Sequence, residues 1–121
     1  MIYLASPYSH ESQHVRAMRW DQVCRAAGAL IASGSHVFSP IAHSHAIATA
    51  GNLATDFDAW RSFDLKMLAV CDELVVLKLD GWQESEGIQS EIQYAIDFGM
   101  PVSYMDWSDE YAAESVTGSP A

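Results

Sequence analysis

Strand-like apolar runs alternate with segments of helical periodicity along almost the whole chain. Residues 74–79 form a largely apolar run that reads as a buried strand, and residues 85–98 follow it with helical spacing. Further strands are predicted over residues 1–6, 35–39 and 102–105, and further helices over residues 9–33 and 56–71. This order is typical of a parallel sheet whose strands are joined by crossover helices.

We therefore expect one three-layer α/β domain over residues 1–107. Its sheet should have four to five parallel strands with helices on both faces, in a flavodoxin-like or Rossmann-like arrangement. The chain has 121 residues, of which 50% are hydrophobic, and this is enough for one core. Ser9 or Ser12 is expected to cap the first helix, residues 41–50 to form a short helix or turn, and residues 108–121 to form a polar tail.

The charge balance limits the possible partners. The formal net charge is −10 and only six residues are Lys or Arg, which argues against duplex nucleic acid because phosphate contacts need many basic groups. No run of about 18 apolar residues is present, so no membrane segment is expected, and the N-terminus does not read as a signal peptide. Cys24 and Cys71 lie in apolar-patterned segments and are expected to be reduced core thiols of a cytoplasmic protein.

Polar side chains gather in the loops that follow the first three predicted strands. Ligands of parallel α/β sheets bind at the carboxyl ends of the strands, where these loops meet. No G-x-G-x-x-G fingerprint follows the first strand, and no P-loop pattern is present. The first loop, residues 6–10, reads either as a turn with a helix cap or as a hydroxyl-rich loop that holds a phosphate or sugar. The predicted substrate contacts are Ser6, Tyr8, Ser9, His43, His45, Asp80, Trp82, Ser85 and Gly87.

His43 and His45 stand at alternate positions in the second loop, a spacing that two metal ligands can have. Zinc sites need three or four ligands, and no further Cys or His lies at matching spacing, so no metal and no cofactor is predicted. Each histidine is read instead as a substrate contact or an ordinary loop residue. Trp82, beside Gly81, is read as a ring that stacks on a base or covers an apolar edge.

Glu91 and Asp64 are the two carboxylates whose surroundings suggest chemistry. Glu91 lies in the first turns of the helix that begins near residue 85, where Gly87 permits close approach and the helix N-terminus favours anions. A Glu in this position acts as a nucleophile or base, or else only complements the helix dipole. Asp64 lies among apolar residues of its helix. Unless it faces solvent, its carboxylate therefore needs a hydrogen-bond or ion partner, or it has a functional role.

Four runs resemble, in order and spacing, the nucleoside 2-deoxyribosyltransferase superfamily. They are IYLASPY at residues 2–8, the segment from Asp64 to Val76, the run SEGIQSEIQYA at residues 85–95, and GMPV at residues 99–102. Members of that superfamily include deoxyribosyltransferases, nucleoside 5′-monophosphate N-glycosidases and small bacterial and phage proteins of unassigned role. The resemblance covers nearly all of residues 1–105, and no single run is highly specific.

The resemblance implies that Glu91 is a nucleophile that attacks the anomeric carbon and expels the base. Water or a second base then resolves the glycosyl-enzyme, so the substrate is a small-molecule nucleotide or nucleoside. The resemblance further implies that Asp64 assists proton transfer to the leaving base and that Tyr3 matches an aromatic residue beside the nucleophile. It also implies a homodimer or higher homo-oligomer, in which a neighbouring subunit often completes the site.

Ser85 bears on whether the substrate carries a phosphate. Relatives that cleave monophosphates tend to have Ser six residues before the nucleophile, whereas those that act on unphosphorylated deoxynucleosides tend to have Asp. The resemblance therefore favours hydrolysis of a nucleoside 5′-monophosphate, with a helix N-terminus and exposed amides around Gly87 that suit a phosphate. The hydroxyls expected to share that phosphate are those of Ser6, Tyr8, Ser9 and Ser85.

Three alternatives stay open. Glu86 places negative charge beside the expected phosphate, and Asp80 offers a sugar-contacting carboxylate, so the substrate is alternatively an unphosphorylated nucleoside. A non-catalytic nucleotide sensor on the same fold is the alternative to an enzyme. Phosphoribohydrolases that release base from modified adenosine monophosphates also use a helix Glu, but their Pro-Gly-Gly loop is missing here.

Overall fold

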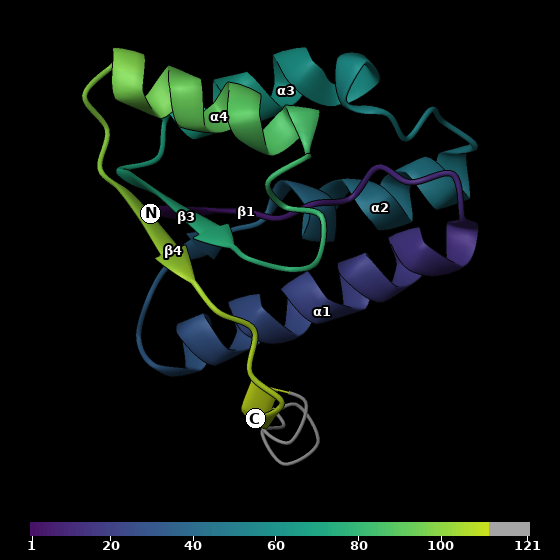
Figure 1. Ribbon diagram of the computed structural model, residues 1–121, viewed down its shortest axis with the longest axis horizontal. Coiled ribbons are helices and arrows are strands. Elements are labelled where there is room, and N and C mark those ends of the chain that lie inside the picture. The colour runs from purple at the N-terminus through teal and green to yellow at the C-terminus, as the bar shows by residue number, and fades with distance from the viewer. Residues whose placement is uncertain (112–121) are drawn as a thin grey trace.

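A parallel sheet of order β2-β1-β3-β4 forms the centre of the protein, with helices on both of its faces (Figure 1). The computed structural model describes residues 1–111, and it confirms the predicted α/β class. The predicted polar tail lies outside the described residues from residue 112 onward. The elements are β1 (Ile2–Ala5), α1 (Gln13–Ala32), β2 (Val37–Phe38), α2 (Pro40–Gly51), α3 (Phe57–Ala69), β3 (Glu73–Leu77), α4 (Glu86–Asp97) and β4 (Val102–Met105).

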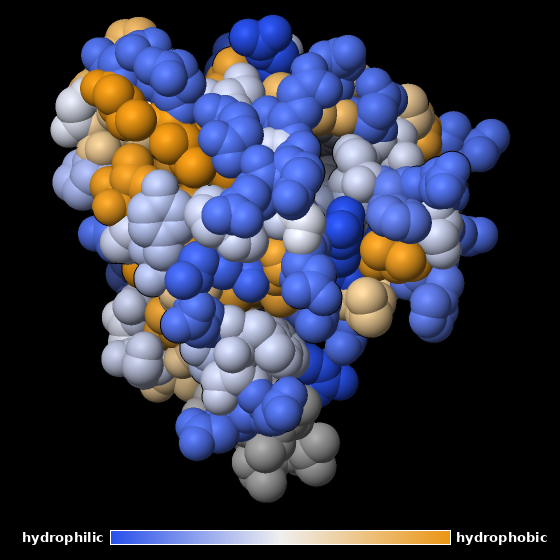
Figure 2. Space-filling view, viewed as in Figure 1, coloured by the Kyte–Doolittle hydropathy of each residue, from blue (hydrophilic) through white to orange (hydrophobic). Residues whose placement is uncertain are grey.

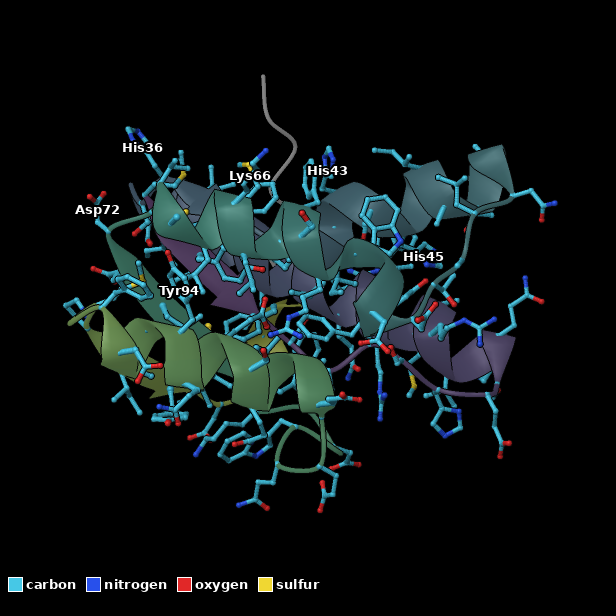
Figure 3. The ribbon with its side chains drawn as sticks, turned by 90° about the horizontal axis from the view of Figure 1, so that it is seen from above. His36, His43, His45, Lys66, Asp72 and Tyr94 are labelled. Carbon is cyan, nitrogen blue, oxygen red and sulfur yellow. The ribbon has the colours of Figure 1, made fainter. Side chains whose placement is uncertain are left out.

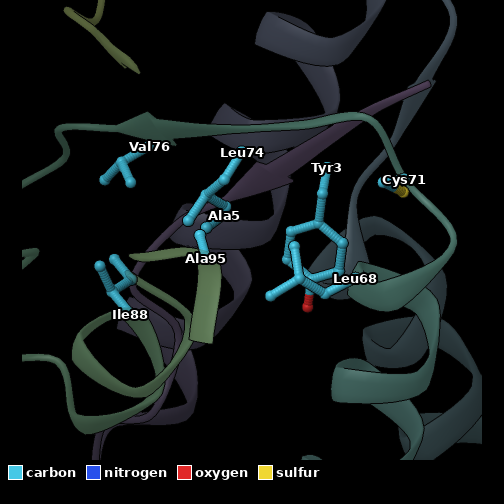
Figure 4. Packing of buried hydrophobic residues seen from close by; sticks show 8 residues of the cluster. All are labelled: Tyr3, Ala5, Leu68, Cys71, Leu74, Val76, Ile88 and Ala95. Atoms are coloured by element: carbon cyan, nitrogen blue, oxygen red, sulfur yellow. The ribbon is translucent and has the colours of Figure 1, made fainter. Parts of the chain in front are cut away.

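The two central strands, β1 and β3, are buried on both faces, as their unbroken apolar runs predict. Alternate side chains point to opposite faces. Tyr3 and Val76 belong to the apolar cluster that packs under α3 and α4 (Figure 4), whereas Leu4 and Leu77 belong to the cluster that packs on α1. Each large apolar side chain buried in this way contributes about 1.5–3 kcal/mol, so both helical layers are held firmly to the sheet.

Serine side chains fix where three of the helices begin. The Oγ atoms of Ser12, Ser39 and Ser85 accept hydrogen bonds from the backbone N–H three residues further on, which satisfies donors that the first turn leaves free. For this reason α1 begins at Gln13 and not at residue 9, and Pro40 is the first residue of α2. The second strand is also shorter than predicted, because only Val37 and Phe38 pair with β1.

The carboxyl ends of the strands lie at one edge of the sheet, since all the pairings are parallel. β2 lies on one side of β1 and β3 on the other, so the direction in which successive strands are added to the sheet reverses at β1. In doubly wound sheets the crevice outside such a switch point is the usual ligand site. The loops after β1 and β3 meet there, as the sequence predicts. The predicted second loop is wrong, because α2 begins directly after Ser39 and carries both His43 and His45.

The surface and the thiols add three observations. No helix within residues 1–111 is long and apolar enough to cross a membrane. Cys24 and Cys71 are both free thiols, and Cys71 is buried. Apolar side chains gather near the end of α4 (orange in Figure 2), where Ile96 and Phe98 are exposed.

The expected oligomer stays a prediction. The rings of Trp60, Trp82 and Trp107, which would support a subunit interface if they were exposed, are half-buried.

Candidate active site

A cavity of about 400 Å³ opens at the carboxyl ends of β1, β2 and β3. Its walls come from the loop after β1, the start of α2, the start of α3 and the first turns of α4. Its volume lies within the range of about 300–1,000 Å³ that is usual for small-molecule sites. Of the residues predicted from sequence, the lining includes Ser6, Tyr8, Ser9, Asp64, Ser85, Gly87 and Glu91.

Glu91 is held in this cavity by Tyr3. Glu91 lies on the buried side of α4 with 4% of its surface exposed, and the Tyr3 hydroxyl donates a short hydrogen bond to its Oε2 atom. Tyr3 is fully buried beneath α3 and α4, where its ring lies beside Leu68 with its hydroxyl pointing away from the strand (Figure 4). A rigid strand residue therefore orients one oxygen of the carboxyl group and leaves the other available to a ligand.

Asp64 is the second buried carboxyl group in the cavity wall. It lies on α3 with 5% of its surface exposed, and its Oδ1 atom has no hydrogen-bond partner among residues 1–111. Burial raises the pKa of Asp64 well above its usual value. An unpartnered buried carboxyl oxygen is costly, so its retention in a cavity indicates a ligand or a proton as its partner.

The two carboxyl groups are electrostatically coupled. Burial raises the pKa of Glu91 well above its usual value, the hydrogen bond from Tyr3 lowers it, and the charge of Asp64 raises it. Two negative charges in one poorly solvated cavity are unfavourable, so the pair retains a proton near neutral pH. Only Glu91 has a hydroxyl donor, which favours ionisation of Glu91 and retention of the proton on Asp64.

Two hydroxyl groups in the wall are placed for a polar ligand. Ser6 Oγ is buried and has no hydrogen-bond partner, so it is free to bond a substrate hydroxyl. The Tyr8 hydroxyl lies 2.6 Å from His45 Nδ1, and the His45 ring stacks on Trp20 with 4.9 Å between ring centroids. The contact with His45, whose ring is held by Trp20, thus fixes the orientation of the Tyr8 side chain.

Four predicted substrate contacts do not line the cavity: His43, His45, Asp80 and Trp82. His43 is exposed and stacks on Phe63, whereas His45 lies behind Tyr8; both are labelled in Figure 3. Asp80 is exposed and contributes its carbonyl oxygen to Arg19, and Trp82 packs against Tyr104. The prediction that these four residues contact the substrate in this cavity is therefore wrong, because they contact other residues instead.

Several lining residues were not singled out from the sequence. Arg19, on α1, donates to the carbonyl oxygens of Ser9 and Asp80 at 3.1 Å each, and so ties two loops of the cavity together. Phe57 and Trp60 supply aromatic surface from α3. Within one sequence, Arg19 resembles any helix arginine, because the contact with residue 80 appears only once the chain is folded. Glu86, whose charge the sequence places beside the expected phosphate, also lines the cavity. The other unpredicted members are Pro40, Ile41, Ser44, Thr55, Asp56, Asp58, Gly81, Glu84 and Ile88.

The first turn of α4 differs from the open phosphate cradle that the sequence suggested. Ser85 Oγ accepts a hydrogen bond from the Ile88 N–H at 3.2 Å, so this amide is already used. A Cβ atom at Gly87 would lie 3.0 Å from Cδ1 of Phe57. The missing side chain at Gly87 thus makes room for the ring of Phe57.

Gly81 provides a test of how Arg19 is placed. Its φ of +88° is unfavourable for other residues, and an added Cβ would lie 2.7 Å from Nη2 of Arg19. Gly81→Ala should therefore lower the free energy of unfolding by about 1–2 kcal/mol, measured by urea denaturation. Gly28→Ala is the control: it lies within α1 with no neighbour within 4 Å, and it should be neutral or stabilising by up to about 1 kcal/mol. Equal effects of both substitutions would contradict this account.

A family model described as "Domain of unknown function (DUF1937)" matches residues 1–107. No curated protein gives a significant match. Within residues 1–111, no three His, Cys, Asp or Glu side chains form a group able to hold a metal ion.

Proposed function

Since the chain belongs to the family described as domain of unknown function DUF1937, whose description states no activity, we propose a function from the cavity itself. The reaction is cleavage of the N-glycosidic bond of a nucleoside or nucleoside 5′-monophosphate through a covalent glycosyl-Glu91 intermediate. The observation that carries the proposal is the pair of buried carboxyl groups, Glu91 and Asp64, in the wall of one cavity. The resemblance to nucleoside 2-deoxyribosyltransferases, in which both positions have a role, supports it.

Glu91 is the nucleophile of the proposed reaction. Its carboxylate attacks the anomeric carbon from the face opposite the base, the carbon–nitrogen bond breaks, and the electron pair leaves with the base. Water then attacks the same carbon, gives one proton to the Asp64 carboxylate, and releases Glu91 and the free sugar; a second base in place of water gives transfer. Two carboxyl groups around an oxocarbenium-like transition state are the usual machinery of retaining glycoside cleavage.

Tyr3 and Asp64 have different roles in the proposed reaction: Tyr3 favours the ionised nucleophile, and Asp64 supplies a proton. The hydrogen bond from Tyr3 favours ionised Glu91 and fixes the direction of attack. Asp64 retains the shared proton and gives it to a ring nitrogen of the departing base, so the base leaves as a neutral molecule. Because the environments of the two carboxyl groups favour different protonation states, we assign Asp64 as the acid and Glu91 as the nucleophile.

The remaining wall residues fit a nucleoside. The free hydroxyl of Ser6 and the fixed hydroxyl of Tyr8 suit sugar hydroxyl groups, while Phe57 and Trp60 offer aromatic surface for a base. The direct test is to incubate the protein with ribo- and deoxyribonucleosides and their 5′-monophosphates and to measure free base by chromatography. Base release from at least one substrate is expected. Thermal stabilisation by these ligands without any base release would favour the nucleotide sensor instead.

Tyr3→Phe tests the role of the hydroxyl. Loss of the hydrogen bond removes an effect that lowers the pKa of Glu91, so that pKa should rise. Base release should fall by about 10-fold to 100-fold, and the acidic limb of the pH–rate profile should move to higher pH. Tyr8→Phe is the control, because Tyr8 lines the cavity without contacting Glu91; it should leave the acidic limb in place. An unmoved acidic limb in Tyr3→Phe would argue against this role.

A further inference from the structure

Four exposed carboxylates in the cavity wall form what we call the acidic collar: Asp56, Asp58, Glu84 and Glu86. Asp64 and Glu91 bring the carboxyl groups of the wall to six. Among the described residues, the only Lys or Arg side chain that lines the cavity is Arg19. Arg19 ties two loops together through their backbone carbonyl oxygens, and its single positive charge offsets at most one of the four negative charges of the collar.

The collar occupies the places where a phosphate would otherwise be held. Glu86 lies in the first turn of α4 and Asp58 in the first turn of α3, so each helix N-terminus already has a carboxylate to complement its dipole. The Ile88 amide bonds to Ser85, and the ring of Phe57 covers Gly87. A phosphate dianion brought here meets several negative charges and few free donors.

Two buried groups indicate what kind of ligand the cavity accepts. Asp64 Oδ1 and Ser6 Oγ lack partners although Asp64 is 5% and Ser6 6% exposed, and both residues line the cavity. A carboxyl oxygen without a donor is completed by a ligand that donates hydrogen bonds or carries positive charge. The collar thus acts on the charge of the ligand, whereas Asp64 and Ser6 provide hydrogen-bonding positions for it.

We propose, on the basis of the proposed function, that the acidic collar makes this site select N-glycosides that carry no phosphate, and prefer those whose base bears a positive charge. When the glycosidic bond of such a substrate breaks, its electron pair neutralises the cationic base. The base then departs without needing a proton. Glu91 forms the bond to the sugar in the same way as with a neutral base.

A matched set of four ligands tests the proposal: guanosine, 7-methylguanosine and the 5′-monophosphate of each. Binding is measured by calorimetry with the Glu91→Gln variant, in which turnover does not interfere. We expect each nucleoside to bind about 10-fold or more tightly than its monophosphate at low salt, and 7-methylguanosine more tightly than guanosine. Both differences should shrink at high ionic strength, because salt screens exposed charges.

The Glu84→Gln/Glu86→Gln double variant, made in the same background, should reduce the discrimination against phosphate several-fold. Glu73→Gln/Glu110→Gln is the matched control, since it changes the net charge equally at exposed carboxylates outside the cavity wall. Equal or tighter binding of the monophosphates would overturn this inference, and so would an effect of the control as large as that of the collar variant. The proposed function is judged separately by base release from the wild-type protein: release from the monophosphates would uphold it even where the collar inference fails.

Discussion

Replacing Glu91 with Gln is expected to lower base release by at least about 10³-fold. The amide has nearly the same shape as the carboxyl group but cannot form a stable bond to the sugar, so the covalent route is lost. The Tyr3 hydroxyl can still donate to the amide oxygen, which keeps the fold and the cavity intact. The measurement is the initial rate of base release under saturating substrate, with ligand binding as the check that the site is preserved.

The same substitution should make the protein more stable at alkaline pH. Because the folded-state pKa of Glu91 is raised above its ordinary value of 4.5, its contribution to stability is fully present below that pH and is lost as pH rises through the raised value. Glutamine does not ionise and avoids this loss. At pH 8 the melting temperature of Glu91→Gln should exceed that of the wild type by roughly 5–10 °C, and at pH 4 the two should be close.

Gln89→Glu gives a matched control for the stability measurement, since Gln89 is exposed on the same helix. It should show little change at either pH. If Glu91→Gln releases base at the wild-type rate, the nucleophile is not Glu91 and the mechanism is wrong. If it also fails to gain stability at pH 8, Glu91 is not the buried, poorly solvated group described here.

Asp64→Asn is expected to have the second-largest effect, a loss of about 10²-fold to 10³-fold in base release from neutral nucleosides. Asparagine preserves the size of the side chain but cannot donate an acidic proton to the departing base. The loss should be much smaller for 7-methylguanosine, because a cationic base leaves without protonation. Comparison of kcat for guanosine and 7-methylguanosine, in the wild type and in Asp64→Asn, measures this difference.

The pH dependence of the wild type follows from the same pair. Base release should fall at acidic pH as Glu91 gains a proton, and at alkaline pH as the pair loses the proton that Asp64 delivers. Asp97→Asn is a suitable control for Asp64→Asn, because Asp97 is an exposed aspartate outside the cavity wall. An equal loss of base release from both guanosine and 7-methylguanosine in Asp64→Asn would contradict a role as general acid.

Much of the fold could be predicted from the sequence because local patterns decide it. The apolar run of β3 and the turn at Gly99 mark their elements clearly, and β4 at Val102–Met105 agrees with the predicted bounds. The start of α1 was misplaced because Ser9 and Ser12 are equally good caps by residue type. Only the folded chain shows that Ser12 bonds the amide of Val15.

The candidate site was harder to predict from the sequence than the fold, because it depends on contacts between residues that are far apart in the sequence. The pairing of Tyr3 with Glu91 joins residues 88 positions apart, and no local pattern reveals it. Burial of Asp64 could be suspected from its apolar neighbours on the helix. Asp56 and Glu84 looked like ordinary solvated carboxylates, and their shared position around one cavity comes from the packing of α3 against α4.

The central claim is that Glu91 forms a covalent bond to the sugar. Incubation with a 2′-fluoro nucleoside, whose fluorine slows formation and breakdown of the glycosyl-enzyme by destabilising the oxocarbenium-like transition state, should trap the intermediate. Mass spectrometry of the digested protein should then show the mass of the fluorinated sugar, without base, on the peptide that contains Glu91, and no such adduct in Glu91→Gln. Base release with an adduct on another residue, or with undiminished rate in Glu91→Gln, would contradict the account.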